Sequence, residues 1–411
     1  MTVKKILLVS GSLSEHVIGD MKERYGYEAG FAIQKYYRLL EKGFERNGME
    51  IDAVSILPIP KKNAPFKLKR YTREKERNVC YSYVPFLAFP PLYHVWMLFC
   101  VMWRVFWWSI KNRKDGVVVC DILIPCLCIG TALGSALAHG RRVAWITDMP
   151  GMDNQRCLHY DEMSVLGRWQ MQCIYRFSGY IFTTVQTYDM LNPHKRPYIV
   201  MEGLVDPDVK APEGLEKNTT RDIFYAGGLV DAYGLDTLCQ AFMKLKNEDI
   251  RLVIYGRGPL AEKIKEYAKE DSRIDYRGAA SNNIIVEAEQ KATLLVNPRF
   301  TGGEYTLYSY PSKNIEYMVS GTPCVTTRLA GIPSDHYPYI YTFDEETVDG
   351  YANTLQSLLK HTNEELLAFG TMAQQYILGN KNATVQTKRI INLVNDIING
   401  VVTTNYPPPV D

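Results

Sequence analysis

Short apolar runs recur along the first half of the chain, and stretches with helical spacing separate them. The segment "EAGFAIQKYYRLLEKGFERNG" (28–48) places its apolar side chains on one face of a helix that ends near Gly48. The strand patterns around such helices are "KKILLVSGS", "MEIDAVSIL", "GVVVCDILI", "RRVAWITDMPG" and "GYIFTTVQT". Strands that alternate with helices in this way predict a parallel, doubly wound sheet.

The alternation restarts after a connection near residue 205 that contains Pro and Gly. Its strand patterns are "DIFYAGGL", "RLVIYGRG", "IDYRGAA" and "ATLLVNPRF". We therefore expect two Rossmann-like α/β domains, residues 1–205 and 206–385, whose strand ends face a central cleft. Residues 386–411 are expected to form a C-terminal helix and a tail, and a return of this helix to the first domain stays open.

Composition fits two soluble domains. The 411 residues are 46% hydrophobic and 22% charged, which allows two cores in domains of about 200 residues each. The nine cysteines show no metal-ligand spacing and the chain starts directly in a strand pattern, which predicts a cytoplasmic protein with reduced thiols. Residues 1–204 carry 27 Lys and Arg against 18 Asp and Glu, while residues 205–411 carry 20 against 27. We expect the basic half to face an anionic partner.

The stretch "YPSKNIEYMVSGTP" (310–323) predicts a helix that begins at Pro311–Ser312 and stops at Gly321. The unpaired amides and positive dipole end of a helix start suit a phosphate. Glu316 lies one turn after Ser312 on the same face, where a carboxylate can bind two vicinal hydroxyls. A phosphate and a diol together indicate a nucleotide. The alternative is a capped helix in which Glu316 only favours the dipole.

Glycine turns follow several strands of the second half. Gly227 and Gly228 stand between a strand and a helix, and Gly256 follows the next strand. Without a Cβ, their backbone amides can approach a phosphate; an ordinary tight turn is the alternative. Arg299 directly follows the strand "ATLLVNP". Its cation is expected on the ligand side of the sheet, with a surface salt bridge as the alternative.

In this order, "AGGL", "YGRGP", "RGAA" and "NPRFTGGEYTLYSYPSKNIEYMVSGTPCVTT" resemble the motifs of glycosyltransferase family 4, which has the GT-B fold. The likeness is greatest to the bacterial branch that builds capsular and exopolysaccharides. It covers nearly all of the chain and is strongest between residues 223 and 333. It implies that the second domain binds a nucleotide-sugar donor and the first an acceptor.

The resemblance also implies roles for single residues of the second domain. Glu316 would bind the ribose hydroxyls. Ser312 and Lys313 would lie at the diphosphate, together with the Gly227–Gly228 loop. The loop around Gly278 would lie near the base.

The diphosphate leaving group needs stabilisation by cations or N–H groups, because no metal-binding cluster of carboxylates is visible in the sequence. Lys313 and Arg299 are the candidates for this charge, and the turn at Gly256 is assigned to the donor as well. No metal and no cofactor are expected beyond the donor, which would be of UDP or GDP type.

The chain departs from the family pattern in two places. Many members carry two glutamates eight residues apart, and Tyr308 stands where the first would precede Glu316. Glu304 is the candidate to approach the donor sugar instead. The basic residue that often follows the glycine turn is also absent, since the chain has "DAY" at 231–233. Phosphate binding must then depend more on Lys313 and Arg299.

In the first domain, Asp148 follows a strand on the expected cleft side. It is a candidate contact or base for the acceptor hydroxyl, and a turn-capping aspartate is the alternative. The loop at residues 10–30 is expected to close over the cleft, with close approach at Gly11 and Gly30. His16 in this loop has no evident partner and stays unassigned.

Residues 61–114 combine basic and aromatic segments. "YHVWMLFCVMWRVFWWSI" (93–110) holds four of the six tryptophans and contains Arg104, and residues 61–77 carry eight basic residues against two acidic. The aromatic segment is short for a membrane span, which needs about 20 apolar residues. We expect one face of its helix to pack on the sheet and the other to touch an anionic membrane; a wholly buried helix is the alternative.

We therefore expect a retaining, metal-independent hexosyltransferase that moves a sugar from a nucleotide-sugar to a polyprenyl-diphosphate-linked or other glycan acceptor. It would act in surface polysaccharide synthesis, on the inner face of the plasma membrane, with no role for nucleic acid. The alternatives are a GT-B-like sugar-nucleotide epimerase and a non-catalytic partner subunit. The sequence leaves the donor sugar, the base, the acceptor, the linkage and the oligomeric state undetermined.

Overall fold

The chain folds into two compact units. The computed structural model describes residues 2–26, 31–57, 71–85, 90–153, 156–157, 159–209 and 217–401. One unit comprises Met1–Pro207 with Asn382–Asp411, and the other Asp208–Lys381. The units thus divide at 207 and 381, where the sequence placed boundaries at 205 and 385. The sequence left open whether the C-terminal helix returns to the first domain. In the structure this helix belongs to the first unit.

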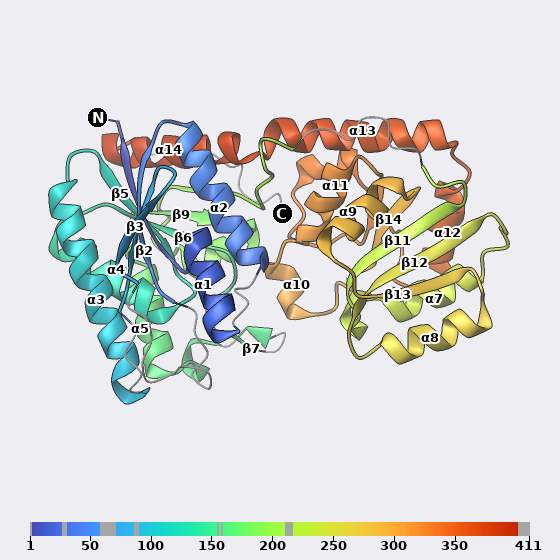
Figure 1. Cartoon of the computed structure of the whole chain (residues 1–411), viewed down its shortest axis with the longest axis horizontal. Helices are drawn as coiled ribbons and strands as arrows, with labels where there is room; N and C mark the ends of the chain where they lie inside the picture. The colour runs from blue at the N-terminus through green and yellow to red at the C-terminus, as the bar shows by residue number, and fades with distance from the viewer. Residues whose placement is uncertain are drawn as a thin grey trace. The chain divides into compact units, whose positions relative to one another are not determined.

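The first unit is built on an eight-stranded sheet (Figure 1). Its order is β10 (Tyr198–Val200), β9 (Gly179–Phe182), β6 (Arg142–Ile146), β5 (Gly116–Asp121), β1 (Lys5–Ser10), β2 (Glu50–Ser55), β4 (Val79–Tyr83) and β3 (Arg73–Glu76). Neighbouring strands are parallel, except that β3 runs antiparallel to β4 at the edge. Every residue of β5 is buried, as expected in a parallel sheet that helices cover on both faces.

Two layers of helices cover this sheet. On one face lie α2 (Phe31–Arg46) and α14 (Ala383–Asn399), and on the other α3 (Pro90–Lys111), α4 (Pro125–Leu137) and α5 (Val165–Ile174) (Figure 1). Gly43 allows the close contact of α2 with α14, because a Cβ there would overlap the carbonyl oxygen of Ala383. Gly134 has the same role between α4 and α3, at the carbonyl oxygen of Met102. The short α6 (Tyr188–Leu191) and the pair β7 (Met152–Asp153) and β8 (Arg156–Cys157) complete the unit.

The second unit has a six-stranded parallel sheet. Its order is β13 (Ile274–Gly278), β12 (Ile250–Arg257), β11 (Arg221–Gly228), β14 (Leu294–Asn297), β15 (Cys324–Thr326) and β16 (Tyr341–Thr342). Its helices are α7 (Leu235–Met243), α8 (Ala261–Glu270), α9 (Asn282–Lys291), α10 (Glu304–Tyr308), α11 (Ser312–Ser320), α12 (Val348–Leu358) and α13 (Asn363–Asn380). Helices lie on both faces, with α7, α8 and α12 on one and α9, α11 and α13 on the other (Figure 1).

These two parallel-sheet α/β units confirm the predicted fold class. Each of the apolar runs predicted as strands lies in a strand of the structure. The helix predicted at Pro311–Ser312 begins there, with Gly321 at its C-cap in the left-handed region (φ +75°). Eight of the nine cysteines are described as free thiols, and six of them are buried.

Residues 10–30, predicted as a loop, contain a helix instead. α1 (Glu15–Tyr25) begins at Ser14, whose side chain accepts a hydrogen bond from the amide of Val17. Val17 and Met21 are buried one turn apart, which attaches the helix to the core. Gly30 lies outside the described residues. The basic stretch 61–77, expected to face an anionic membrane, is described only from Tyr71, and Arg73–Glu76 within it form the edge strand β3.

Candidate functional site

The carboxyl ends of β11 and β12 meet at two glycines. The strands are parallel neighbours in which Gly227 lies opposite Gly256. Gly256 has a φ of +147°, and a Cβ there would overlap the carbonyl oxygen of Gly227. Only glycine fits this close approach of two strand ends. Gly278 ends β13 on the same edge of the sheet, where the Tyr276 hydroxyl donates to the Gly256 carbonyl at 3.0 Å.

Lys313 extends over the Gly227 turn. A Cβ added to Gly227 would lie 2.6 Å from the Cε atom of Lys313 and 2.8 Å from the Tyr225 hydroxyl. Tyr225 holds the turn from below by donating to the Gly228 carbonyl at 2.9 Å. Lys313 has no hydrogen-bond or ion-pair partner among the described residues. Its ammonium group is therefore free to bind a ligand above the turn.

The start of α11 adds unpaired amides to the same place. Pro311 is the N-cap and provides no side-chain cap, so the first N–H groups of the helix stay available. Ser312 and Glu316 are exposed on one face, one turn apart. The opposite face fixes the helix: Asn314 accepts a hydrogen bond from Asn297 of β14 at 2.8 Å, and Tyr317 is fully buried. This arrangement can bind an anion at the helix start and a diol one turn further on.

Arg299 follows β14 and lies between two tyrosines. Its Cζ atom is 4.6 Å from the ring centroid of Tyr305 and 5.4 Å from that of Tyr233. Its Nε atom donates to the Tyr305 hydroxyl at 3.2 Å. A Cβ on Gly228 would lie 3.3 Å from the Tyr233 ring. Arg299 therefore lies beside the glycine turn over which Lys313 extends.

The segment between β14 and α11 carries the remaining predicted residues. Glu304 is exposed at the first position of α10, directly after Gly303. Tyr308, which stands where the family has its first glutamate, ends the same short helix and is partly buried. The structure thus brings Gly227, Gly228, Gly256 and Lys313 together and connects Arg299 to them through the Tyr233 ring. Ser312 and Glu316 lie on the same helix as Lys313.

Asp148 of the first unit caps a turn. It is exposed after β6, and its Oδ1 atom accepts a hydrogen bond from the amide of Met149 at 2.9 Å. Sequence reasoning missed a second aspartate at the neighbouring strand end, Asp121 of β5. Asp121 is buried and accepts from the Tyr37 hydroxyl at 2.7 Å and from the Leu123 amide at 3.0 Å. Burial raises its pKa. The signal was available, since "VVVCD" is also an apolar strand that ends in a carboxylate.

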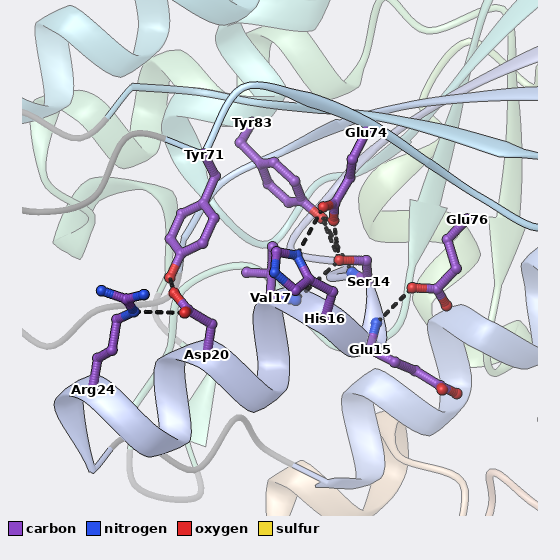
Figure 2. Close-up of polar contacts among 10 residues, drawn as sticks. All are labelled: Ser14, Glu15, His16, Val17, Asp20, Arg24, Tyr71, Glu74, Glu76 and Tyr83. Carbon is purple, nitrogen blue, oxygen red and sulfur yellow. Dashed lines mark hydrogen bonds and ion pairs between the residues drawn. The ribbon is translucent and has the colours of Figure 1, made fainter.

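The start of α1 is closed by side chains of the protein (Figure 2). Glu74 of β3 accepts hydrogen bonds from the hydroxyls of Ser14 and Tyr83, and its Oε2 atom lies 3.0 Å from Nδ1 of His16. Burial would raise the pKa of Glu74, but the bonds from Ser14, Tyr83 and His16 outweigh it and lower that pKa. Beside it, Glu76 accepts from the amide of Glu15 at 2.8 Å. His16, unassigned from sequence, thus has a structural partner.

Helix α3 buries one face and exposes the other. Val101 and Val105 are fully buried, whereas Trp103 and Trp107 are 51% and 52% exposed. The other exposed apolar side chains of α3 are Leu92, Val95, Trp96, Phe99 and Ile110. Arg104 turns toward the sheet and donates to the Ser82 carbonyl at 2.9 Å. Of the described helices, α3 included, none has the length and apolarity that a membrane crossing requires. We call this set of exposed apolar residues the α3 face.

In the described part of the chain, no three His, Cys, Asp or Glu side chains are grouped as metal ligands. The independence from metal that the resemblance implies stays a prediction.

Comparison with known proteins supports a resemblance to group 1 glycosyltransferases, whereas family 4 and its capsular branch stay predictions. Residues 220–361 match the family model "Glycosyl transferases group 1". The comparison with curated proteins gives no match. A glycosyltransferase from Rickettsia africae is 11% identical with a TM-score of 0.65, over 97% of this chain and 99% of that one.

Two further solved structures are similar along the whole chain. The lipopolysaccharide outer core galactosyltransferase WaaB is 14% identical with a TM-score of 0.59, over 96% of this chain and 99% of that one. Anabaena HepE in complex with UDP is 11% identical with a TM-score of 0.58, over 95% and 100%. At these identities the likeness shows the fold, which is GT-B.

Proposed function

We propose that this protein is a glycosyltransferase that moves a sugar from a nucleoside diphosphate sugar to a glycan acceptor. The observation that carries the proposal is the position of Lys313 over the Gly227 turn, at the uncapped start of α11, with Arg299 stacked on the Tyr233 ring that lies against Gly228. Two cations and free amides around one glycine turn provide the charge that a departing diphosphate needs. The group 1 glycosyltransferase model matches this unit, and HepE, which has the same fold, binds UDP.

Each residue has a distinct role in this proposal. Lys313, Arg299 and the amides at Ser312 stabilise the diphosphate as the bond to the sugar breaks, and no metal takes part. Glu316 binds the two ribose hydroxyls, the base lies toward Gly278, and Glu304 contacts the donor sugar. The sugar keeps its anomeric configuration, as the resemblance to family 4 implies. Asp148 contacts the acceptor from the first unit.

Nucleotide titration of the unaltered protein and of Glu316→Ala tests the donor site. A carboxylate that binds two hydroxyls contributes hydrogen bonds to a charged group, so its loss should weaken UDP or GDP binding roughly 10- to 100-fold. The affinity for uridine or guanosine alone should fall by the same factor in this variant, because both nucleosides contain the ribose. Glu266→Ala is the matched control, since Glu266 is also exposed on a helix of this unit. Equal affinities for the unaltered protein and Glu316→Ala would overturn the ribose assignment.

A donor-hydrolysis assay with a panel of nucleotide-sugars separates the candidate functions. Release of free nucleoside diphosphate without epimerised sugar supports transfer, and epimerised nucleotide-sugar supports the epimerase. Failure of the unaltered protein to bind any nucleotide supports the non-catalytic partner subunit, which the missing first glutamate at Tyr308 allows.

The acceptor is proposed to be a polyprenyl-diphosphate-linked or other lipid-linked glycan, reached from the inner face of the plasma membrane in surface polysaccharide synthesis. Two features of the first unit support this. The α3 face exposes several tryptophans, and Lys111, Arg113 and Lys114 are exposed at its C-terminal end. Each basic residue near an anionic surface contributes about 1 kcal/mol. WaaB, which has the same fold, acts on lipopolysaccharide.

Vesicle sedimentation tests the α3 face. Vesicles with phosphatidylglycerol should bind the protein, and the double variant Trp103→Glu, Trp107→Glu should lose about tenfold or more in vesicle affinity while its circular dichroism stays unchanged. Leu367→Glu, Met372→Glu is the matched control, because these side chains are similarly exposed on α13. Unfolding of the tryptophan variant would instead indicate that α3 serves mainly to complete the core of the first unit.

A further inference from the structure

Arg299 differs from two other arginines that stack on rings in this unit, and it differs from Arg328, which stacks on the single ring of Tyr337, by lying against two rings. Arg273 lies over Phe242 and pairs with Asp271, and Arg277 lies over Tyr255 and pairs with Asp275. Arg299 stacks on two rings and forms no ion pair with the described residues. Its charge is therefore supported by aromatic faces and is not neutralised by a carboxylate.

The tyrosine hydroxyl occupies only one of the guanidinium donors. Arginine has five N–H groups in a planar fork, and Nε–H is bound to Tyr305. The four N–H groups at the end of the fork stay free of described partners. A planar fork with free ends matches the paired oxygens of a phosphate.

The turn that carries the Tyr233 ring is fixed to the segment that carries Arg299, and the Tyr305 ring belongs to α10. Tyr233 belongs to the turn after β11, and the Phe300 amide donates to the Ala232 carbonyl at 3.1 Å. Gly234, with a φ of +66°, packs so closely on this segment that a Cβ would overlap the Pro298 carbonyl oxygen. The guanidinium is thus held rigidly, and a charge placed in advance does not have to reorganise when a ligand binds.

The same turn lacks the basic residue expected after the glycines, because it has Asp231, Ala232 and Tyr233. The Tyr233 ring lies next to Gly228 and brings Arg299 to the turn from the neighbouring strand. Burial raises the pKa of the Tyr225 hydroxyl under the turn. The nearby Tyr233 raises this pKa further, and the Arg299 cation lowers it. Both side chains therefore lie close to the atoms that support Gly227 and Gly228.

We infer that Tyr233 and Tyr305 are positioning residues, which hold the Arg299 guanidinium at the donor diphosphate in place of a basic residue on the glycine turn. The inference rests on the proposed function, since it names the ligand of that site. Tyr233 acts through its ring alone. Tyr305 acts through its ring and its hydroxyl. Neither residue touches the sugar.

Calorimetric titration with UDP and with uridine tests this inference. Tyr233→Leu and Tyr305→Leu should each weaken UDP binding about tenfold and leave uridine binding unchanged, because only the diphosphate contacts Arg299. Tyr233→Phe should keep full affinity. Tyr305→Phe should lose roughly threefold, since it keeps the ring and loses one hydrogen bond. If GDP proves to be the ligand, guanosine replaces uridine.

Tyr337→Leu is the matched control. Tyr337 stacks with Arg328 at 5.1 Å in the same unit and is not part of the site, so its loss should leave both affinities unchanged. If the leucine variants weaken uridine and UDP equally, or if Tyr233→Phe loses as much as Tyr233→Leu, the inference is wrong while the donor site stands. If the unaltered protein binds neither nucleotide, the proposed function itself fails.

Discussion

The starts of α1 and α11 show two different ways to satisfy the amide end of a helix. Both helices begin near the carboxyl end of a parallel sheet, where ligands of such folds bind. At α1, Ser14 caps the Val17 amide, Glu74 binds the Ser14 hydroxyl and Glu76 accepts from the Glu15 amide. The protein's own carboxylates occupy the position that an anion would take.

The first turn of α11 holds no acidic residue. Pro311 offers no side-chain cap, Ser312 is exposed, and Lys313 extends over the glycine turn that Arg299 lies beside. The same helix dipole thus faces carboxylates in the first unit and cations in the second. A helix start is open to a ligand only where the chain does not fill it with its own side chains. The start of α1 therefore serves the fold, and the start of α11 is the one that the proposed function uses for anion binding.

The largest expected effect comes from removing the cation at α11. Lys313→Ala should lower the rate of donor hydrolysis about 100-fold, the typical cost of losing one donor that stabilises a leaving group.

Gly227→Ala should lower the same rate about tenfold, because its Cβ would lie 2.6 Å from Cε of Lys313 and displace that flexible side chain. Neither change should alter the affinity for the bare nucleoside; an equal loss there would point to a damaged fold.

Removing a carboxylate at α1 should change stability and not ligand binding. Glu74→Ala removes the acceptor of the Ser14 hydroxyl and leaves the Tyr83 hydroxyl with the Ser14 oxygen as its remaining acceptor, which should lower the free energy of unfolding by about 2 kcal/mol in urea denaturation. Lys75→Ala, on the opposite face of β3, is the control and should cost much less. A loss of UDP affinity in Glu74→Ala would contradict the division of roles between the two helix starts.

The smallest expected effect concerns Glu41, a buried carboxylate of the first unit. Glu41 is buried and accepts from the Tyr81 hydroxyl at 2.7 Å, and burial raises its pKa from 4.5 to about 7. The folded protein therefore binds a proton that the unfolded chain releases, and this stabilisation is present below pH 4.5 and lost as the pH rises to about 7. Glu41→Gln cannot lose a proton, so its melting temperature should fall less between pH 5 and pH 8. Identical slopes would show that Glu41 is not protonated in the folded state.

Local patterns were sufficient for much of the site. The helix at Ser312, its end at Gly321 and the face shared by Ser312 and Glu316 follow from spacing and turn residues, and the structure has them. The glycines at 227, 256 and 278 end three adjacent strands, because parallel strands bring their carboxyl ends to one edge. The residue roles at this edge stay predictions until ligand binding is measured.

Other features depended on contacts between distant residues. The "loop" at 10–30 contains α1, whose local signals, the Ser14 N-cap and the Gly26 C-cap, were present in the sequence but were not recognised. Its contacts with Glu74 and Glu76, about sixty positions later, could not be read from the local pattern. His16 had no evident partner because that partner lies on an edge strand that the sequence pattern did not predict. For Asp148 the structure shows the hydrogen bond from the Met149 amide that a turn cap makes, and its role toward the acceptor stays a prediction.

The sequence by itself determined that two parallel-sheet domains form, where their strands end in glycine, and that an uncapped helix start carries a lysine and a glutamate one turn apart. These properties depend on the spacing of apolar residues, on backbone freedom at glycine and on helix periodicity, all of which act over a few residues. Only the tertiary structure decided that Lys313 lies over Gly227 and that two tyrosines hold Arg299. Those contacts join residues from different strands and loops, and the packing of the sheet alone sets which of them meet.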